Sequence, residues 1–280
     1  MSTEDNLTHD HPTDDTSDEP QVLYHYTNQA GMLGILKSAS LWATKIQYFN
    51  DSAEYHLTLR LAETLIQDFA RDQRHALHSD ADRDALLSEI RSIEHANIFV
   101  ISLSTLNDSL SQWRAYGTPS SGFAIGMRRA DLEFIAEGID WQLFRCVYVP
   151  EDHRKLVGRA VANAMQSASA ALGGNVLREE LTSIAPRVKH PSFEEEDEWR
   201  IVSPVLPEEF GFSYRVGRFT PVPYVPLPIT RHDNNESSIE EVVVGPTPHR
   251  DLAIMATASY LRTMEVSART IASGTTFREW

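Results

Sequence analysis

The chain contains 280 residues, of which 41% are hydrophobic and 23% charged, a composition typical of a globular protein with a substantial core. Its formal net charge of −15 argues against a general nucleic-acid binder and against a protein that binds anionic membranes. No segment is long and apolar enough to span a bilayer, and the N-terminus lacks the basic and apolar regions of a signal peptide, so we expect a cytoplasmic protein.

The chain begins with an acidic tail and continues with two short strands and a helix. Residues 1–20 contain seven acidic side chains, no Lys or Arg and almost nothing apolar, so we expect this tail to be disordered. Alternating apolar residues over 21–26 predict a strand. Asn28 suits the N-cap of a short helix that continues to Leu36, and residues 40–44 predict a second strand.

Two longer helices are expected next. Leu57, Leu61 and Leu65 are four residues apart, which predicts a helix from about residue 51 to residue 78. The apolar residues of 80–96 predict another helix. We expect these two helices to form a hairpin laid over the sheet.

A central strand is expected at residues 97–104, because the segment NIFVISLS is apolar on both faces. Cys146 is the only cysteine, so an intrachain disulfide is excluded, a metal site is not expected, and a buried thiol is favoured. The other expected elements are a loop or short helix at 105–121, a strand at 122–127, a helix at 131–137, a strand at 141–149, helices within 151–186 that break at Gly173-Gly174, strands at 198–204, 212–216, 224–228 and 239–244, a helix at 249–262 and a closing strand at 266–268.

The order of these elements lacks the regular alternation of a parallel sheet. It predicts an α+β fold with a mixed, mostly antiparallel split sheet and helices packed on it. We expect a single domain over residues 21–280, with helical insertions near 52–96 and 151–186. The sequence contains no GxGxxG, GxxxxGK[ST], HExxH or GxSxG motif, so the common nucleotide, zinc and hydrolase sites are not indicated.

The segment FEEEDEWRIV at residues 193–202 concentrates charge in front of an apolar alternation. If it is a strand, Glu196, Glu198 and Arg200 share one face, and Trp199 and Ile201 can enter a core from the other. Two carboxylates this close raise each other's pKa unless a cation or a hydroxyl donor offsets them. The alternative is an edge strand that carries charge to prevent pairing between sheets.

Three other polar clusters are candidate site residues. His25, Tyr26 and Thr27 follow one another in the first strand, although His25 also suits a core histidine. Asp51 and Glu54, after Asn50, have the spacing of a capping box, an explanation that we favour over a direct role in catalysis. The third cluster joins Ser102 to Ser104 with Gln112, Trp113, Arg114 and Tyr116. Its two aromatic residues also suit a core, and Arg114 also suits the surface.

The order of these motifs resembles DUF2971, a bacterial family of unknown function. The similarity extends over most of residues 22–270, and WRAYG followed by GFAIGM, and FxxExEWR, are its specific parts. The segments that carry it are LYHYT at 23–27, GILKSASLWAT at 34–44, FNDSAE at 49–54, ISLS at 101–104, QWRAYG at 112–117, GFAIGM at 122–127, FEEEDEWRIV at 193–202 and EEVVVGP at 240–246.

That family is itself distantly similar to ADP-ribosyltransferases, and the resemblance implies an ADP-ribosyltransferase-like fold with NAD as substrate. It implies that Glu198 stabilises a cationic ribose and that Glu196, with a raised pKa, orients or deprotonates the acceptor. The middle Ser-Thr-Ser motif of such enzymes is only approximated by Ser102-Leu103-Ser104. The implied cofactor-binding residues are His25 at the adenosine ribose, Tyr26 against the nucleotide, Arg114 at the pyrophosphate, and Thr27, Trp113 and Tyr116.

Three functions stay open at this point. The first is an NAD-consuming ADP-ribosyltransferase with an unidentified macromolecular or small-molecule acceptor, acting as a bacterial toxin or phage-defence effector. The second is a non-catalytic nucleotide-binding or regulatory module of the same fold, because each candidate residue also suits a structural role. The third is an RNA-processing relative, against which the acidic balance argues.

Overall fold

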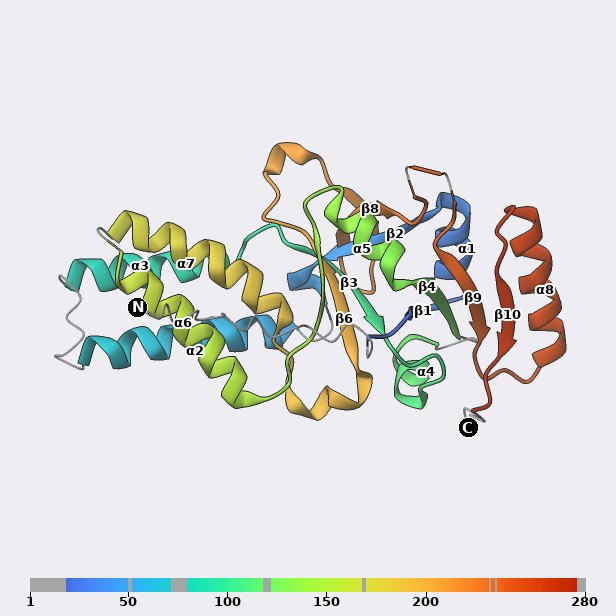
Figure 1. Cartoon of the computed structure of the whole chain (residues 1–280), viewed down its shortest axis with the longest axis horizontal. Helices are drawn as coiled ribbons and strands as arrows, with labels where there is room; N and C mark the ends of the chain where they lie inside the picture. Colours follow the sequence, from blue (N-terminus) through green and yellow to red (C-terminus); the bar gives the residue numbers. More distant parts are fainter. Residues whose placement is uncertain are drawn as a thin grey trace, which may run out of the picture.

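The computed structural model describes residues 19–49, 52–71, 80–117, 122–167, 170–231, 233–234 and 236–275 (Figure 1). Residues 1–18 of the tail expected over 1–20 lie outside these ranges, as do Asn50 and the expected capping-box residues, Asp51 and the side chain of Glu54. The described strands are β1 (Val22–Asn28), β2 (Ser40–Lys45), β3 (Phe99–Ser104), β4 (Gly122–Arg128), β5 (Gln142–Arg145), β6 (Glu198–Val202), β7 (Ser213–Val216), β8 (Pro221–Pro228), β9 (Ile239–Val244) and β10 (Arg269–Ala272). The described α-helices are α1 (Gln29–Ser38), α2 (Ser52–Arg71), α3 (Asp80–Ile93), α4 (Leu110–Tyr116), α5 (Arg129–Glu137), α6 (Pro150–Met165), α7 (Ala170–Ile184) and α8 (Arg250–Thr263).

One mixed sheet organises the strands, in the order β10-β9-β4-β1-β3-β2-β8-β7. The strands β5 and β6 lie off this path, because β6 pairs with β3 and β5 pairs with β6. The pair β10-β9 is parallel, and the other pairs between the described strands are antiparallel. The prediction of an α+β fold with a mostly antiparallel split sheet is therefore confirmed.

The sheet splits at β3, which is central as expected. On one edge, β6 pairs with β3 continuously from Val100 to Ser104. On the other edge, β1 pairs only with Ser104, and β2 pairs only with Phe99 and Val100. The strands β1 and β2 diverge because β1 continues along β4 and β2 continues along β8. Ser102 lies in the gap that they leave.

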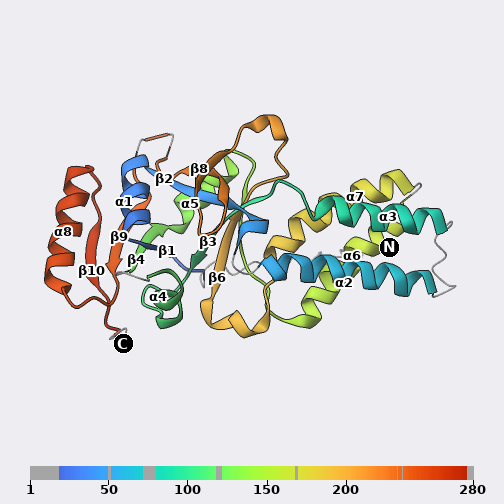
Figure 2. The ribbon, with the colours of Figure 1, turned by 180° about the vertical axis from the view of Figure 1, so that it is seen from behind.

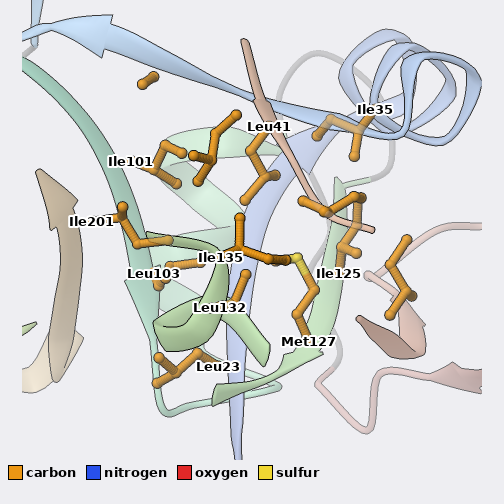
Figure 3. Packing of buried hydrophobic residues seen from close by; sticks show 14 of the residues in the cluster. Leu23, Ile35, Leu41, Ile101, Leu103, Ile125, Met127, Leu132, Ile135 and Ile201 are labelled. Atoms are coloured by element: carbon orange, nitrogen blue, oxygen red, sulfur yellow. The ribbon is translucent and has the colours of Figure 1, made fainter. Parts of the chain in front are cut away.

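The main core lies on one face of the sheet, beneath α1 and α5 (Figure 3). The alternation of β3 sends Ile101 and Leu103 into this core, beside Leu41 of β2 and Ile201 of β6. Trp199 is buried in the same core, as predicted from its place on the apolar face of the FEEEDEWRIV segment. On the opposite face of β3 and β6, Val100 and Val202 pack into a second core, and the positions further along the two strands are polar: Ser102, Ser104, Glu198 and Arg200.

A second core joins the helices α2, α3, α6 and α7 into a bundle that extends away from the sheet (Figures 1 and 2). The expectation that the helical hairpin lies over the sheet is therefore wrong. The predicted stripe of α2 is borne out at Leu65, which is buried, and at Leu61, which packs against the core, but not at Leu57, which is exposed. The stripe follows the helical period through Tyr55, Leu59, Ala62 and Ile66.

Further corrections concern element boundaries. The helix break expected at Gly173-Gly174 is wrong, because both glycines lie within α7, and α6 ends earlier, at Met165. Gly173 serves helix packing, since a Cβ there would lie 2.5 Å from the Ala164 carbonyl oxygen of α6. The closing strand expected at 266–268 is β10, further along the chain, and the strand expected at 141–149 is the shorter β5. Cys146 is buried, as expected.

Candidate functional site

A cavity of about 680 Å³ lies at the split of the sheet. This volume falls within the range of roughly 300–1,000 Å³ that is usual for small-molecule sites. Its lining comes from segments far apart in the sequence, on both sides of β3. The predicted site residues that line it are His25, Tyr26, Thr27, Tyr116, Glu196 and Glu198. Trp113 and Arg114 are not among the lining residues.

Glu198 is the most constrained carboxylate in the cavity. It begins β6 opposite Ser104 and is only 4% exposed. Its Oε1 accepts a hydrogen bond from Arg200 Nε at 2.8 Å, and its Oε2 accepts one from Arg200 Nη2 at 3.0 Å. Every position of β6 is buried, and β6 is paired on both edges. The alternative of a charged edge strand is therefore wrong, and Arg200 is the ionic partner of Glu198 within the strand.

Lys189 is the cation that sequence reasoning missed. Its Nζ donates to Glu198 Oε2 and to Glu196 Oε2, each at 2.5 Å, so it lies between the two carboxylates. Glu196 does not share the strand with Glu198, because it ends the 3₁₀ helix η5 (Pro191–Glu196). Asp197, in the left-handed region with φ 39°, makes the turn into β6. The cation thus offsets the repulsion that the Glu-x-Glu spacing predicted.

The protonation states follow from these contacts. Burial raises the pKa of Glu198, but the charges of Arg200 and Lys189 outweigh it and hold the pKa at about 2. Burial lowers the pKa of Lys189, but Glu198 and Glu196 outweigh that effect and leave the pKa above its ordinary value. Both groups are therefore charged at neutral pH. The four residues Lys189, Arg200, Glu196 and Glu198 form an ion network without net charge.

His25 projects from β1 at the gap in the sheet. Its Nδ1 lies 3.0 Å from the Ser102 carbonyl oxygen. Burial lowers the pKa of His25, and the nearby charge of Arg215 lowers it further, while the hydrogen bond with Ser102 opposes both. The ring is therefore neutral at pH 7. Because a carbonyl oxygen can only accept, Nδ1 carries the proton, and Nε2 keeps a lone pair that can accept a hydrogen bond.

Tyr26 is held by the segment that follows β3. Its hydroxyl donates to the Leu106 carbonyl oxygen at 2.7 Å and accepts from the Ser109 amide at 3.1 Å. Burial raises the pKa of this hydroxyl. Its ring packs edge-on against Trp113, with 4.7 Å between the ring centroids. Both hydrogen bonds of the Tyr26 hydroxyl are therefore made within the protein, although Tyr26 still lines the cavity.

Trp113 has a structural role in this arrangement. Its Nε1 donates to Asp108 Oδ1 at 2.7 Å, and the residue is 3% exposed. Glycines make room for the indole, because a Cβ on Gly122 or Gly245 would lie 3.0 Å or 2.9 Å from its Cε3. This packing gives a physical reason for the occurrence of Trp113 in WRAYG together with the first glycine of GFAIGM and the glycine of EEVVVGP.

Tyr116 and Arg114 occupy different parts of α4. Tyr116 is 39% exposed and lines the cavity. Arg114 is exposed and does not line the cavity, so it is not positioned to contact a ligand there as the resemblance implied. A different arginine, Arg215 of β7, lines the cavity instead. Aromatic residues that sequence reasoning also missed line the same space: Trp42, Tyr48, Phe49 and Tyr55.

Neither a metal-ion cluster nor a helix able to cross a membrane is found among the described residues. No cluster of three or more His, Cys, Asp or Glu side chains there is arranged to hold a metal ion. Within the same described ranges, none of the helices combines the length and the apolar character needed to cross a membrane.

The chain is therefore an α+β protein with a charged, aromatic-lined cavity at the split of its sheet. Residues 112–201 match the model of DUF2971, a protein family of unknown function. The resemblance inferred from the motifs is thus confirmed over the segment that runs from α4 to β6 and contains Lys189, Glu196 and Glu198. No curated protein matches the chain. The solved structure of Thermus sp. 2.9 DarT, in complex with ADP-ribosylated single-stranded DNA, is similar with a TM-score of 0.36 and 13% identity, over 90% of this chain and 94% of that one.

Proposed function

We propose that the chain binds NAD in the cavity at the split of the sheet and acts as an ADP-ribosyltransferase. The observation that carries this proposal is that neutral His25 and the carboxylates Glu196 and Glu198 line one cavity, although they come from distant segments. The cavity size suits a small-molecule ligand. Resemblance of the motifs to a family that is similar to ADP-ribosyltransferases supports the same ligand.

The carboxylates suit the chemistry of this transfer. The bond between ribose C1′ and nicotinamide breaks, nicotinamide leaves with the electron pair, and positive charge develops on the ribose. A carboxylate beside the ribose stabilises that charge, a role we assign to Glu198. The acceptor then forms its bond to C1′, and its proton passes to Glu196, which η5 holds at the edge of the ion network.

The neutral imidazole suits recognition of a sugar. Its Nδ1 is occupied by the Ser102 carbonyl, so Nε2 is available as an acceptor. A ribose hydroxyl donates to such an acceptor, whereas a phosphate or a carboxylate cannot. The aromatic side chains of Trp42, Tyr48 and Tyr116 add flat apolar surfaces suited to a nucleobase or nicotinamide ring.

A second function, a nucleotide-binding module without transfer activity, is favoured by one observation. Both oxygens of Glu198 already bind cations, with Arg200 on both and Lys189 on Oε2. These cations neutralise the carboxylate in the ground state and weaken its field at a developing ribose cation. Transfer then requires that Lys189 move toward Glu196 when substrate binds.

Incubation of the purified chain with NAD separates the two functions. NAD labelled on nicotinamide should release nicotinamide, and a second label on adenine shows whether ADP-ribose becomes attached or stays free. Release should fall by about 100-fold in folded Glu198→Gln protein, a loss comparable with removal of one strong electrostatic group. Glu195→Gln, on the exposed part of η5, is the matched control and should retain release.

Binding without release would leave the non-catalytic module as the function, and absence of NAD binding would overturn both. A role as a toxin or phage-defence effector in the bacterial cytoplasm is a further step of this proposal. It is supported by the family resemblance, and it stands only if the chain consumes NAD.

A further inference from the structure

Arg215 is a cation in the cavity without an ionic partner among the described residues. It lies on β7 and is half-buried. Its Nη2 donates to the hydroxyl of Thr44 on β2 at 3.1 Å, and no described carboxylate forms an ion pair with it. Lys189 and Arg200, in contrast, each bind Glu198. The same cavity thus holds two compensated cations and one that is not compensated.

The charge of the lining follows from this difference. Lys189 and Arg200 balance Glu196 and Glu198, and His25 is neutral, so Arg215 gives the charged lining residues a net charge of +1. Burial lowers the pKa of Arg215, with partial opposition from Tyr224, yet a guanidinium keeps its charge at neutral pH. A positive cavity in a chain with a net charge of −15 is suited to an anionic ligand.

The sheet fixes where this cation lies. The strands β2, β8 and β7 run side by side, with Leu41 and Val225 on the face toward the main core. The opposite face carries Thr44 and Trp42, and Trp42 stacks on Tyr224 with 4.8 Å between centroids. Because β2 and β6 pair with opposite edges of β3, the Arg215 guanidinium and the ion network of Glu198 reach the cavity from its two sides.

We propose that Arg215 binds the diphosphate of the nucleotide that occupies this cavity, an inference that rests on the proposed function. A guanidinium offers two parallel donors that match two phosphate oxygens, and the Thr44 hydroxyl holds one of its nitrogens in place. The chain has no glycine-rich phosphate loop, so the negative charge must be met by a side chain. Arg215 takes the role that the sequence suggested for Arg114.

The test compares ligands with and without phosphate on three proteins by calorimetry. Wild-type chain should bind ADP-ribose more tightly than adenosine. Arg215→Gln should lose on the order of 10- to 100-fold in affinity for ADP-ribose and keep its affinity for adenosine. Arg218→Gln is the matched control, because Arg218 lies in the same hairpin, is exposed and packs on Phe219 at 5.0 Å instead of lining the cavity. It should bind both ligands as the wild type does.

Salt provides a second measurement, since affinity for ADP-ribose should weaken with ionic strength more steeply in the wild type than in Arg215→Gln. Equal losses for ADP-ribose and adenosine would overturn the inference, because Arg215 would then merely shape the cavity. Arg215-dependent binding of a single-stranded oligodeoxynucleotide, with unchanged ADP-ribose binding, would overturn it in favour of an acceptor phosphate.

The inference and the proposed function fail in different ways. ADP-ribose that binds equally to wild type and Arg215→Gln would end the inference and leave NAD as the ligand. Inorganic pyrophosphate that binds in an Arg215-dependent way, without binding of NAD, would keep the anion site and end the proposed function. If neither ADP-ribose nor pyrophosphate binds the wild type, the inference is wrong.

Discussion

The two edges of β3 are paired very differently. Along one edge, β6 forms a continuous antiparallel ladder from Val100 to Ser104. Along the other, β1 and β2 reach only the two ends, and the Ser102 carbonyl accepts from a side chain, His25, in place of a neighbouring strand. The first edge is closed and the second is open.

This difference in strand pairing gives the two edges of β3 different roles, the closed edge in stability and the open edge in ligand binding. At the closed edge, backbone pairing buries the start of β6, so the carboxylate of Glu198 must be matched by cations. At the open edge, the missing strand leaves space, and Arg215 keeps a charge that the described residues do not neutralise. Substitutions at the closed edge should therefore change folding most, and substitutions at the open edge should change ligand binding most.

Glu198→Gln at the closed edge should have the largest effect on stability. The amide cannot neutralise Arg200 and Lys189, which stay buried at 7% and 3% exposure. Removal of one partner from a buried ion pair costs about 3–5 kcal/mol, and urea unfolding should show this loss. Unchanged or higher stability of the variant would contradict this prediction and show that repulsion between Glu196 and Glu198 outweighs the cation between them.

Glu241→Gln is the control for this prediction. Glu241 is also buried, and it accepts from the Tyr24 hydroxyl at 2.8 Å and from Arg269 at 2.7 Å. Arg269 is 67% exposed at its side chain, so water can solvate it when the carboxylate is lost. The cost should be smaller than at Glu198. Equal costs for the two variants would contradict the view that the closed edge requires its cations.

Acid should act on the same group. The folded pKa of Glu198, about 2, lies below its ordinary value of 4.5, so its contribution to stability is present above pH 4.5 and is lost as the pH falls toward 2. Glu198→Gln should lack this part of the acid dependence. The pH dependence of unfolding is a second measurement on this variant. It distinguishes an effect of the lost charge from an effect of altered packing.

The open edge should respond to pH through His25, with a medium effect. The pKa of His25 in the folded chain is lowered below 6.5, so the neutral ring contributes to stability above pH 6.5, and this contribution is lost as the pH falls through the folded pKa. Protonation also removes the Nε2 acceptor. Affinity for NAD should therefore be constant above pH 6.5 and fall by about tenfold per pH unit below the folded pKa.

Two variants make this prediction specific. His25→Gln should bind NAD more weakly at all pH values and lose the pH dependence. His153→Gln should keep it, because His153 lies on α6, outside the cavity, with its Nε2 2.7 Å from the Val147 carbonyl oxygen. An unchanged pH profile in His25→Gln would show that another group titrates.

The closed edge was predicted better from the sequence than the open edge. The reason is how far apart along the chain the contacting residues lie. The continuous apolar run of β3 indicated a central strand, and alternation within β6 indicated a buried Trp199, since both patterns are local properties of the sequence. Asn28 was found from the residue preference of helix starts, and its side chain does cap α1. The neighbouring Lys189 was missed because it belongs to no periodic pattern, although it lies only nine residues from Glu198.

The open edge depends on pairs that no local pattern encodes. Arg215 meets Thr44 across 171 residues, and His25 meets Ser102 across 77. The family resemblance implied that Arg114, within QWRAYG, is a ligand-binding cation, but packing of Trp113 among glycines explains the motif without one. Which arginine enters the cavity is decided by sheet order, and sheet order was not predicted from the residues.

Asn28→Ala should have the smallest effect and sharpens the comparison, because Asn28 lines the cavity at the open edge yet makes a structural bond. Its side chain accepts from the Gly31 amide at 2.9 Å at the start of α1. Loss of such a cap costs about 1 kcal/mol, so the midpoint of urea unfolding should fall modestly. The matched control is Ser109→Ala, because Ser109 precedes α4 without a capping side-chain bond, so its replacement should cost less stability.

NAD affinity should stay near the wild-type value in Asn28→Ala. A large loss of NAD affinity with unchanged stability would show that the Asn28 amide faces the ligand and that the open edge recognises more of it than His25 and Arg215 do.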